Sequence, residues 1–481
     1  MSTAVIIGGG ISGLSAAYYL SKLLTVSSTF QKVILVEGSA HLGGWIKSKR
    51  YDDGTVYELG PRSIRPANKQ GFNTLEMVED LGLSSKVLPV LTDHVASNNR
   101  FIYVDGKLAM LPTPKALFRS SPLLNQSLAS MLWKELFTKS IKVEDETADS
   151  FITRRFSKKA AMYLADPMCQ GVFAGKSTEL SARSCFSDVF KAEQEYGSIV
   201  KGMFKSARLK KDSAKSQLGM LAKQQRWTMW SLQDGLQTLS DSLTDTLSES
   251  EHIMVQSQEP CTALGFQNGK IVVETPNLKI EANHVFSALP AKDISKLLYP
   301  NHQDLAQILG RIQSCTVGVV NLEYKGRPVK TEGFGYLIPS SEKAKILGVV
   351  FDSCAFPQLD RNDGEYSRFS CLMGGAWFEE LYGNADSVDP NTLLDVAVES
   401  MRNHLGVTVN PVRSNVTINK NCIPQYYVGH HNIVSSSRQY ITQNRLPISL
   451  LGASYDGASI NDCIYNARKE VEAVVGVKNT S

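Results

Sequence analysis

Three glycines and one glutamate near the start of the chain have the spacing of a nucleotide-binding site. Gly8, Gly10 and Gly13 form the pattern G-x-G-x-x-G, between a β-branched run and a predicted helix. Such a turn lets the backbone approach a pyrophosphate, and the helix N-terminus adds a partial positive charge. Glu37 ends a second apolar run, where a carboxylate can bind ribose hydroxyl groups. These residues predict a dinucleotide-binding site.

Two further glycine-rich elements favour FAD over NAD as the dinucleotide. Gly43 and Gly44 follow Glu37 after a short interval, and residues 451–464 (LGASYDGASINDCI) lie near the C-terminus. NAD enzymes usually carry the first motif alone, whereas this three-part layout occurs in the flavin amine oxidases and desaturases. The rigid turn 60–63 follows Gly44 and carries one cation, Arg62. We therefore expect this turn to contact the cofactor as well.

The composition is that of an ordinary globular protein with two or three domains. The chain has 481 residues, of which 42% are hydrophobic and 20% charged. A net charge of +4 is too small to favour a nucleic-acid partner. We find neither an apolar run long enough to span a membrane nor a cleavable leader, so we expect any organelle signal to be internal. Eight cysteines without C-x-x-C spacing predict neither a disulfide framework nor a metal site.

The elements that must position these residues predict an α/β protein. We expect a Rossmann-like FAD-binding domain, a substrate domain built on an antiparallel sheet, and a mostly helical, membrane-associated domain. The predicted boundaries are 1–90, 227–290 and 418–481 for the FAD-binding domain, 91–226 for the helical domain, and 291–417 for the substrate domain. Residues 252–255, 270–274 and 284–289 are predicted to be strands of one small sheet, and four strands between 317 and 373 to form a separate antiparallel sheet.

Two stretches of the helical region are open to more than one interpretation. Residues 121–137 are rich in apolar and aromatic side chains. Such side chains fit a protein core, a helix that lies in a membrane surface, or the apolar entrance to a substrate site. Residues 201–226 contain eight Lys or Arg and a single acid, Asp212. This basic stretch fits a solvated loop or a segment attracted to anionic lipid.

Over essentially its whole length the chain resembles the animal, mitochondrial type of protoporphyrinogen oxidase, within the flavin amine oxidase superfamily. The resemblance rests on GGGISGL (8–14), NRFIYV (99–104), GFGYLIPSSE (333–342), NCIPQY (421–426) and the 451–464 element. It implies FAD contacts by Gly8, Gly9, Gly10, Ile11, Ser12, Gly13, Glu37, Trp45, Gly60, Pro61, Arg62, Ser63, Pro260, Ala453, Ala458, Ser459 and Ile460.

The resemblance also implies a substrate pocket. Arg100 matches an arginine that pairs with a substrate propionate, and Phe334, Gly335, Leu337 and Leu372 match the residues that sandwich the tetrapyrrole. Because Phe334 and Leu337 are three residues apart, both face inward only if the strand is irregular at Gly335. Ser63 and Leu372 depart from the family pattern, which often has Gly and can have Met at these positions.

The implied activity is an FAD-dependent, oxygen-using oxidation of protoporphyrinogen IX to protoporphyrin IX in haem biosynthesis. It removes six electrons by successive hydride transfers to flavin N5 and gives hydrogen peroxide, with one non-covalent FAD per chain. The resemblance further implies a homodimer, held peripherally on the inner mitochondrial membrane at its intermembrane-space side, and a hand-off to ferrochelatase. Two alternatives stay open: a flavin oxidase or desaturase of amines or polyenes, and a lipid-binding protein without flavin.

Overall fold

The first β-branched run forms the central strand of a five-stranded parallel sheet. The computed structural model describes residues 2–24, 29–113, 116–209 and 214–476. The sheet has the order β11-β2-β1-β15-β21, formed by β1 (Thr3–Ile7), β2 (Lys32–Val36), β11 (Ile253–Gln256), β15 (His284–Ser287) and β21 (Ile448–Leu450). Ala4 and Ile6 pack into one core cluster and Val5 and Ile7 into another, because successive side chains of a strand point to opposite faces. Both faces of this sheet are therefore buried.

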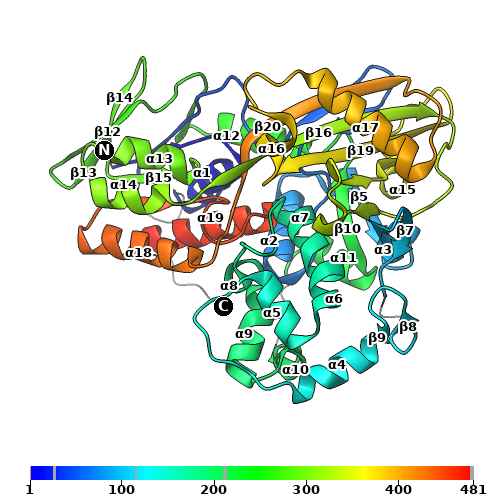
Figure 1. Cartoon of the computed structure of the whole chain (residues 1–481). Helices are drawn as coiled ribbons and strands as arrows, with labels where there is room; N and C mark the ends of the chain where they lie inside the picture. The colour runs from blue at the N-terminus through cyan, green and yellow to red at the C-terminus, as the bar shows by residue number, and fades with distance from the viewer. Residues whose placement is uncertain (1, 25–28, 114–115, 210–213, 477–481) are drawn as a thin grey trace.

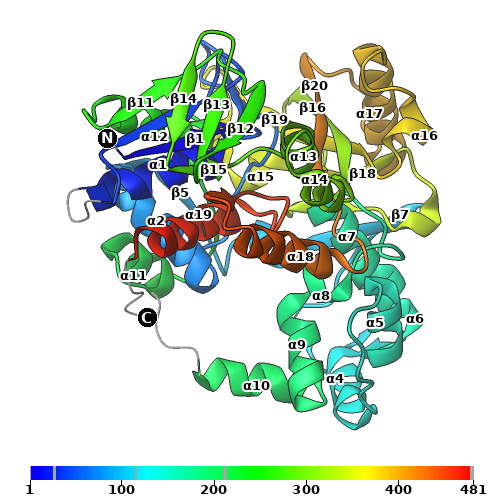
Figure 2. The same ribbon diagram turned by 90° about the vertical axis from the view of Figure 1, so that its left-hand side faces the viewer.

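Helices cover the two faces of this sheet (Figures 1 and 2). On the face of Ala4 and Ile6 lie α1 (Ile11–Leu24), α12 (Gln237–Ser248) and α19 (Ile460–Val475). On the face of Val5 and Ile7 lie α13 (Ala291–Leu298), α14 (Gln303–Gly310) and α18 (His430–Gln443). This is the layered arrangement of a dinucleotide-binding domain.

The small sheet predicted from residues 252–255, 270–274 and 284–289 is wrong. β11 and β15 join the parallel sheet, whereas β13 (Lys270–Glu274) pairs with β12 (Ala263–Gln267) and β14 (Lys279–Ala282) in an antiparallel sheet. All these segments are short and similarly apolar, so their composition indicates strands without indicating their partners.

A second, seven-stranded sheet has the order β20-β16-β19-β18-β17-β6-β7. Its strands are β6 (Arg100–Val104), β7 (Lys107–Met110), β16 (Ser314–Lys325), β17 (Gly335–Leu337), β18 (Ile346–Val350), β19 (Tyr366–Gly375) and β20 (Arg413–Pro424). The antiparallel sheet predicted between 317 and 373 is confirmed, and β6, β7 and β20 extend it. β6 and β17 pair in parallel, and α16 (Phe378–Tyr382) and α17 (Pro390–Leu405) pack against the sheet.

The helical region forms a separate lobe. It contains α4 (Leu128–Phe137), α5 (Ala148–Arg155), α6 (Lys158–Ala160), α7 (Asp166–Phe173), α8 (Ala182–Cys185), α9 (Ser187–Tyr196) and α10 (Ile199–Leu209). α11 (Gln217–Gln224) lies outside this lobe, because its Leu218 and Ala222 pack into the same core cluster as α1 and its first N–H groups bond to Glu79 of α2 (Asn68–Asp80). In Figure 2, α4 and α10 lie at the end of the molecule away from both sheets. At the start of the apolar stretch 121–137, β8 (Ser120–Ser121) pairs with β9 (Gln126–Ser127), and the helix α4 begins at Leu128.

Three segments pack differently from the predicted domain boundaries. β6 and β7, within the predicted helical domain, are strands of the seven-stranded sheet. α13 and α14, within the predicted substrate domain, pack on the parallel sheet. β20 crosses the predicted boundary at 417/418 and pairs with β16 up to Pro424.

Among the described residues, none of the helices has the length and apolar character needed to cross a membrane.

Candidate active site

The glycine turn between β1 and α1 is packed too tightly for any larger residue at Gly13. A Cβ atom on Gly13 would lie 1.9 Å from the carbonyl oxygen of Gly8. The Gly43 N–H donates to the Gly9 carbonyl at 2.8 Å, which joins the second glycine pair to the first turn. Beside them, a Cβ atom on Gly10 would meet only the Gly44 Cα, at 3.9 Å. The turn therefore leaves its backbone open on the side where a pyrophosphate fits.

Glu37 stands at the end of β2 and holds the same turn. Its Oε2 accepts a hydrogen bond from the Gly9 N–H at 2.6 Å, and its Oε1 accepts from the Ser39 N–H and hydroxyl, each at 2.8 Å. A Cβ atom on Gly38 would lie 3.2 Å from the Cβ of Pro260, which places Pro260 against the loop after Glu37. Glu37 and Pro260 thus lie beside the first glycine turn, as predicted from the sequence.

The C-terminal glycine element meets the first turn. A Cβ atom on Gly452 would lie 3.6 Å from the Ser12 Oγ, and the Ala453 carbonyl accepts a hydrogen bond from the Tyr426 hydroxyl. The Ser459 side chain caps α19 by accepting from the Asp462 N–H at 3.2 Å, with Ile460 as the first helical residue. The segment that leads into α19 therefore lies against the N-terminus of α1, where the positive end of the helix dipole favours negative charge.

Arg62, in the turn 60–63, forms an ion pair with a residue next to the seven-stranded sheet. Its Nη1 lies 3.1 Å from the Asp352 Oδ1, and the Asp352 Oδ2 accepts from the Ser370 hydroxyl at 2.6 Å. The Arg62 Nη2 is buried and has no hydrogen-bond partner in the described residues. A buried guanidinium N–H without an acceptor fits a ligand that supplies one, such as FAD. Trp45 is 40% exposed, so it can contact a ligand.

Arg100 is the second cation with unused hydrogen-bonding capacity. It begins β6 opposite Gly335, and its guanidinium lies 5.9 Å from the centre of the Phe334 ring. Its Nε is buried without a partner in the described part of the chain. Burial lowers the pKa of Arg100, and the positive charge of Arg65 lowers it further. The arrangement suits a carboxylate, which both the charge and the free N–H groups favour.

The strand β17 begins with an unusual backbone conformation at Gly335. Gly335 has φ +135°, and a Cβ atom there would lie 2.1 Å from the Val349 carbonyl oxygen. Its pairing with Val350 and Arg100 is regular, while a register shift occurs between Ile346 and Gly348 where β18 pairs with β19. The irregularity expected at Gly335 is therefore a positive φ, and the bulge lies in the neighbouring strand.

The other predicted pocket residues lie in two apolar clusters. Leu372 packs with Leu347 and Ala174, and the Leu337 side chain faces Gly171 of α7, whose Cβ would lie 2.8 Å from its Cδ1. Phe334 packs in a different cluster, with Phe356. The structure thus brings Phe334 to Arg100, and Leu337 to the helical lobe.

Sequence reasoning missed Asp352. Asp352 directly follows the buried strand β18 and Phe351, and an acid at the end of an apolar run is a signal that could have marked it.

Comparison with known proteins defines the class. The sequence pattern of the flavin containing amine oxidoreductases matches residues 11–475, and the chain belongs to this family. It is 42% identical to the protoporphyrinogen oxidase of Homo sapiens over 481 residues, covering 100% of this chain and 99% of that protein. It is 41% identical to that of Bos taurus over 480 residues, with coverage of 100% and 99%.

Solved structures show the same fold. A putative protoporphyrinogen oxidase from Exiguobacterium sp. matches with a TM-score of 0.76 at 21% identity, covering 98% of each chain. The cyclohexylamine oxidase of Brevibacterium oxydans matches with a TM-score of 0.69 at 13% identity, covering 99% of each chain. The predicted α/β fold class, the predicted oxidoreductase and the predicted FAD are confirmed. The roles of the individual site residues stay predictions.

Proposed function

We propose that this chain oxidises protoporphyrinogen IX to protoporphyrin IX, with FAD as its cofactor and dioxygen as the final electron acceptor. The observation that carries the proposal is the guanidinium of Arg100, a partly buried cation that lies against Phe334 and has no acidic partner among the residues that the structure describes. A large apolar macrocycle with carboxylates on one edge needs apolar walls and a fixed cation. Full-length identity to curated protoporphyrinogen oxidases supports the same substrate.

When bound, FAD accepts hydride equivalents from a substrate and passes the electrons to dioxygen, which gives hydrogen peroxide. The protein's contribution is orientation and electrostatics. The glycine turn, Glu37 and Arg62 would hold the cofactor non-covalently, one per chain, while Arg100 and the apolar side chains would set the macrocycle against it. Electron-rich pyrrole nitrogens assist loss of hydride, so we assign no side-chain base. The reaction repeats until six electrons have been removed.

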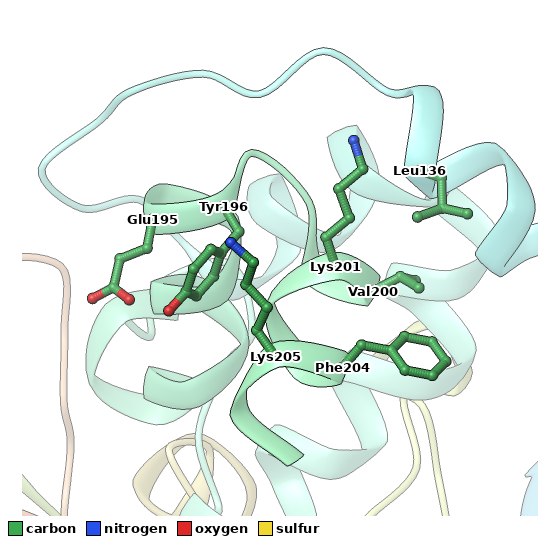
Figure 3. A pocket seen from close by; sticks show the side chains of 7 residues that line it. All are labelled: Leu136, Glu195, Tyr196, Val200, Lys201, Phe204 and Lys205. Carbon is green, nitrogen blue, oxygen red and sulfur yellow. The ribbon is translucent and has the colours of Figure 1, made fainter. Parts of the chain in front are cut away.

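We propose that the helical lobe contacts a membrane surface peripherally. Trp133 and Phe137 of α4 and Met203 and Phe204 of α10 are exposed, and we call them the α4–α10 apolar surface. A hollow of about 570 Å³ lies among α4, α9 and α10, lined by Leu136, Glu195, Tyr196, Val200, Lys201, Phe204 and Lys205 (Figure 3). Exposed aromatic side chains beside lysines are typical of helices that lie in the interface of anionic lipid.

Buried polar contacts hold α4 and α10 together. The Glu135 carboxylate accepts hydrogen bonds from the Ser198 hydroxyl at 2.7 Å and from the N–H groups of Ile199 and Val200 at 2.8 and 3.2 Å. It also forms a fully buried ion pair with Arg155. Buried polar groups fix α10 against α4, which keeps the apolar surface together. By resemblance, we propose that this surface faces the inner mitochondrial membrane from the intermembrane space, in a homodimer that passes its product to ferrochelatase.

A single experiment tests cofactor and substrate. The purified protein is mixed anaerobically with protoporphyrinogen IX, and flavin absorbance and porphyrin fluorescence are followed together. Bleaching of the flavin band with growth of porphyrin fluorescence supports the proposal. A yellow protein that stays oxidised contradicts the proposed substrate and favours amines or polyenes, and a colourless protein contradicts the cofactor assignment.

A further inference from the structure

The loop between β21 and α19 lies between two segments that are predicted to bind the cofactor. Near its start, a Cβ atom on Gly452 would lie 3.6 Å from the Ser12 Oγ at the N-terminus of α1. Near its end, the Asn461 side chain donates to the Arg65 carbonyl at 2.8 Å, just after the turn 60–63. The conformation of this loop therefore shapes the predicted cofactor site.

The hydroxyl of Tyr426 joins two points of this loop. It donates to the Ala453 carbonyl and accepts from the Gly457 N–H at 3.1 Å. Within the part of the chain that the structure describes, it is the only acceptor of that N–H. Burial raises the pKa of Tyr426 well above its usual value of 10, so the hydroxyl keeps its proton and remains a donor. One oxygen atom thus fixes both ends of the segment 453–457.

Tyr426 is itself held in place by its surroundings. Its side chain is buried, and its ring stacks on that of His430, with 4.1 Å between the ring centres and 17° between the planes. Its carbonyl accepts from the Ser181 N–H of the helical lobe at 2.7 Å, and the N–H of the preceding Gln425 donates to the Gln313 carbonyl at 2.8 Å. Because neither the ring nor its backbone is free to move, the hydroxyl is a fixed point for the loop.

We propose that Tyr426 is a positioning residue of the cofactor site, whose hydroxyl holds the segment 453–457 in the conformation that binds FAD. The inference rests on the proposed function and on the predicted FAD contacts of Ala453 and Ala458, and it adds a residue that acts on the cofactor through the loop. A loop that is already ordered costs no free energy of ordering when the cofactor binds. The fixed hydroxyl should therefore slow the release of FAD.

The test uses the FAD-loaded full chain with Tyr426→Phe and, as a matched control, Tyr455→Phe. Tyr455 lies in the same loop and is also buried, and its hydroxyl has no hydrogen-bond partner among the described residues. Its ring packs in the core cluster of Val5 and Ile7. Both variants lose one buried phenolic oxygen, but only Tyr426→Phe breaks hydrogen bonds. The release of FAD after dilution is followed by the fluorescence of free flavin, and circular dichroism establishes that each variant is folded.

We expect Tyr426→Phe to release FAD about tenfold faster than the wild type, which corresponds to one buried hydrogen bond. Tyr455→Phe should release FAD at the wild-type rate. Excess FAD should restore the flavin content of Tyr426→Phe, because its loop is loosened while the rest of the site is intact. Equal release rates for Tyr426→Phe and the wild type, or equally fast release from both variants, would overturn the inference.

A measurement on the wild type keeps the inference testable if Tyr426→Phe does not fold. Hydrogen exchange of the Gly457 amide should be slow in the FAD-loaded protein, because its N–H is bonded to the buried Tyr426 hydroxyl. Exchange as fast as that of an exposed amide would overturn the inference. The proposed function fails separately: a protein with the expected release rates that does not oxidise protoporphyrinogen IX would contradict the substrate and support the role of Tyr426.

Discussion

Arg62 and Asp352 form an ion pair across 290 residues of sequence, with 3.1 Å between Nη1 and Oδ1. Arg62 belongs to the turn beside the glycine motif, and Asp352 begins α15 (Asp352–Ala355), just after β18 of the seven-stranded sheet. Their side chains are only 10% and 12% exposed. The pair therefore ties the nucleotide-binding part of the molecule to the sheet that carries the proposed substrate pocket.

Asp352→Ala should destabilise the protein strongly, because it leaves a buried cation without its anion. We expect the free energy of unfolding to fall by about 3–5 kcal/mol, with weaker retention of FAD. Asp241→Ala is the matched control: Arg50 and Asp241 are also 3.1 Å apart, but their side chains are 40% and 44% exposed. Such a surface pair contributes about 1 kcal/mol or less. Urea unfolding of both variants checks the difference, and equal small losses would contradict a structural role for the Arg62–Asp352 pair.

Gly13→Ala should abolish flavin binding. The added Cβ atom would lie 1.9 Å from the Gly8 carbonyl oxygen, so β1 and α1 must move apart at the pyrophosphate position. Gly265→Ala is the control, since its Cβ would meet its nearest neighbour, the Val272 Cβ, at an ordinary 3.6 Å. Visible absorbance of the purified proteins and circular dichroism give the readout. A folded Gly13→Ala protein with full flavin content would refute the assignment of this turn.

Glu58 should make stability depend on pH. Burial raises the pKa of this carboxyl from 4.5 to about 7, although the Leu236 N–H and the Ser48 hydroxyl donate to it. Between these values the folded protein keeps a proton that the unfolded chain has lost, so this group's contribution to stability falls as the pH rises. At 1.36 kcal/mol per pKa unit, the wild type should lose roughly 3 kcal/mol of unfolding free energy between these pH values. Glu58→Gln should not show this loss, because its side chain does not titrate.

Urea unfolding at pH 5 and pH 7.5 measures this effect on the FAD-loaded protein. The wild type should lose more stability between the two pH values than Glu58→Gln does. The exposed Glu249, just after α12, provides the control variant Glu249→Gln, which should follow the wild-type profile. Parallel profiles for all three proteins would argue against a protonated Glu58.

Local patterns of the sequence correctly predicted the elements of the first glycine motif, because these elements are encoded in one short run. A strand, a glycine turn and a helix are adjacent at residues 3–24, and the structure reproduces them in that order. Pairings between distant segments were harder to predict. The sequence of β6 gives no indication that Arg100 pairs with Gly335, and that of β18 gives none that Asp352 meets Arg62. Such contacts depend on tertiary packing, which outweighs local preference.

Arg100→Ala should raise KM more than it slows flavin reduction. The substitution removes the cation that we propose binds the substrate carboxylate before and during the reaction alike, so its loss weakens binding without changing the reacting atoms. Stopped-flow reduction at saturating protoporphyrinogen IX separates the two quantities. Arg327→Ala is a suitable control because that arginine is exposed and pairs with Glu365. Slow reduction with unchanged substrate affinity would contradict a binding role for Arg100.

Removing aromatic side chains from the α4–α10 apolar surface should weaken membrane contact without affecting catalysis in detergent. The side chains of Trp133, Phe137 and Phe204 are 65%, 73% and 69% exposed, so replacing all three by Ser removes little packing from the protein's own core. The variant loses the favourable free energy of moving these side chains from water into lipid, which is about 25 cal/mol per Å² of apolar surface. Sedimentation with vesicles containing an anionic lipid should show a large drop in bound protein.

Val409 and Val412 are also exposed, each at 54%, but lie in another part of the chain, beside β20. Their double Ser variant should bind vesicles as the wild type does, and equal losses for the two variants would show that the α4–α10 apolar surface is not the membrane contact.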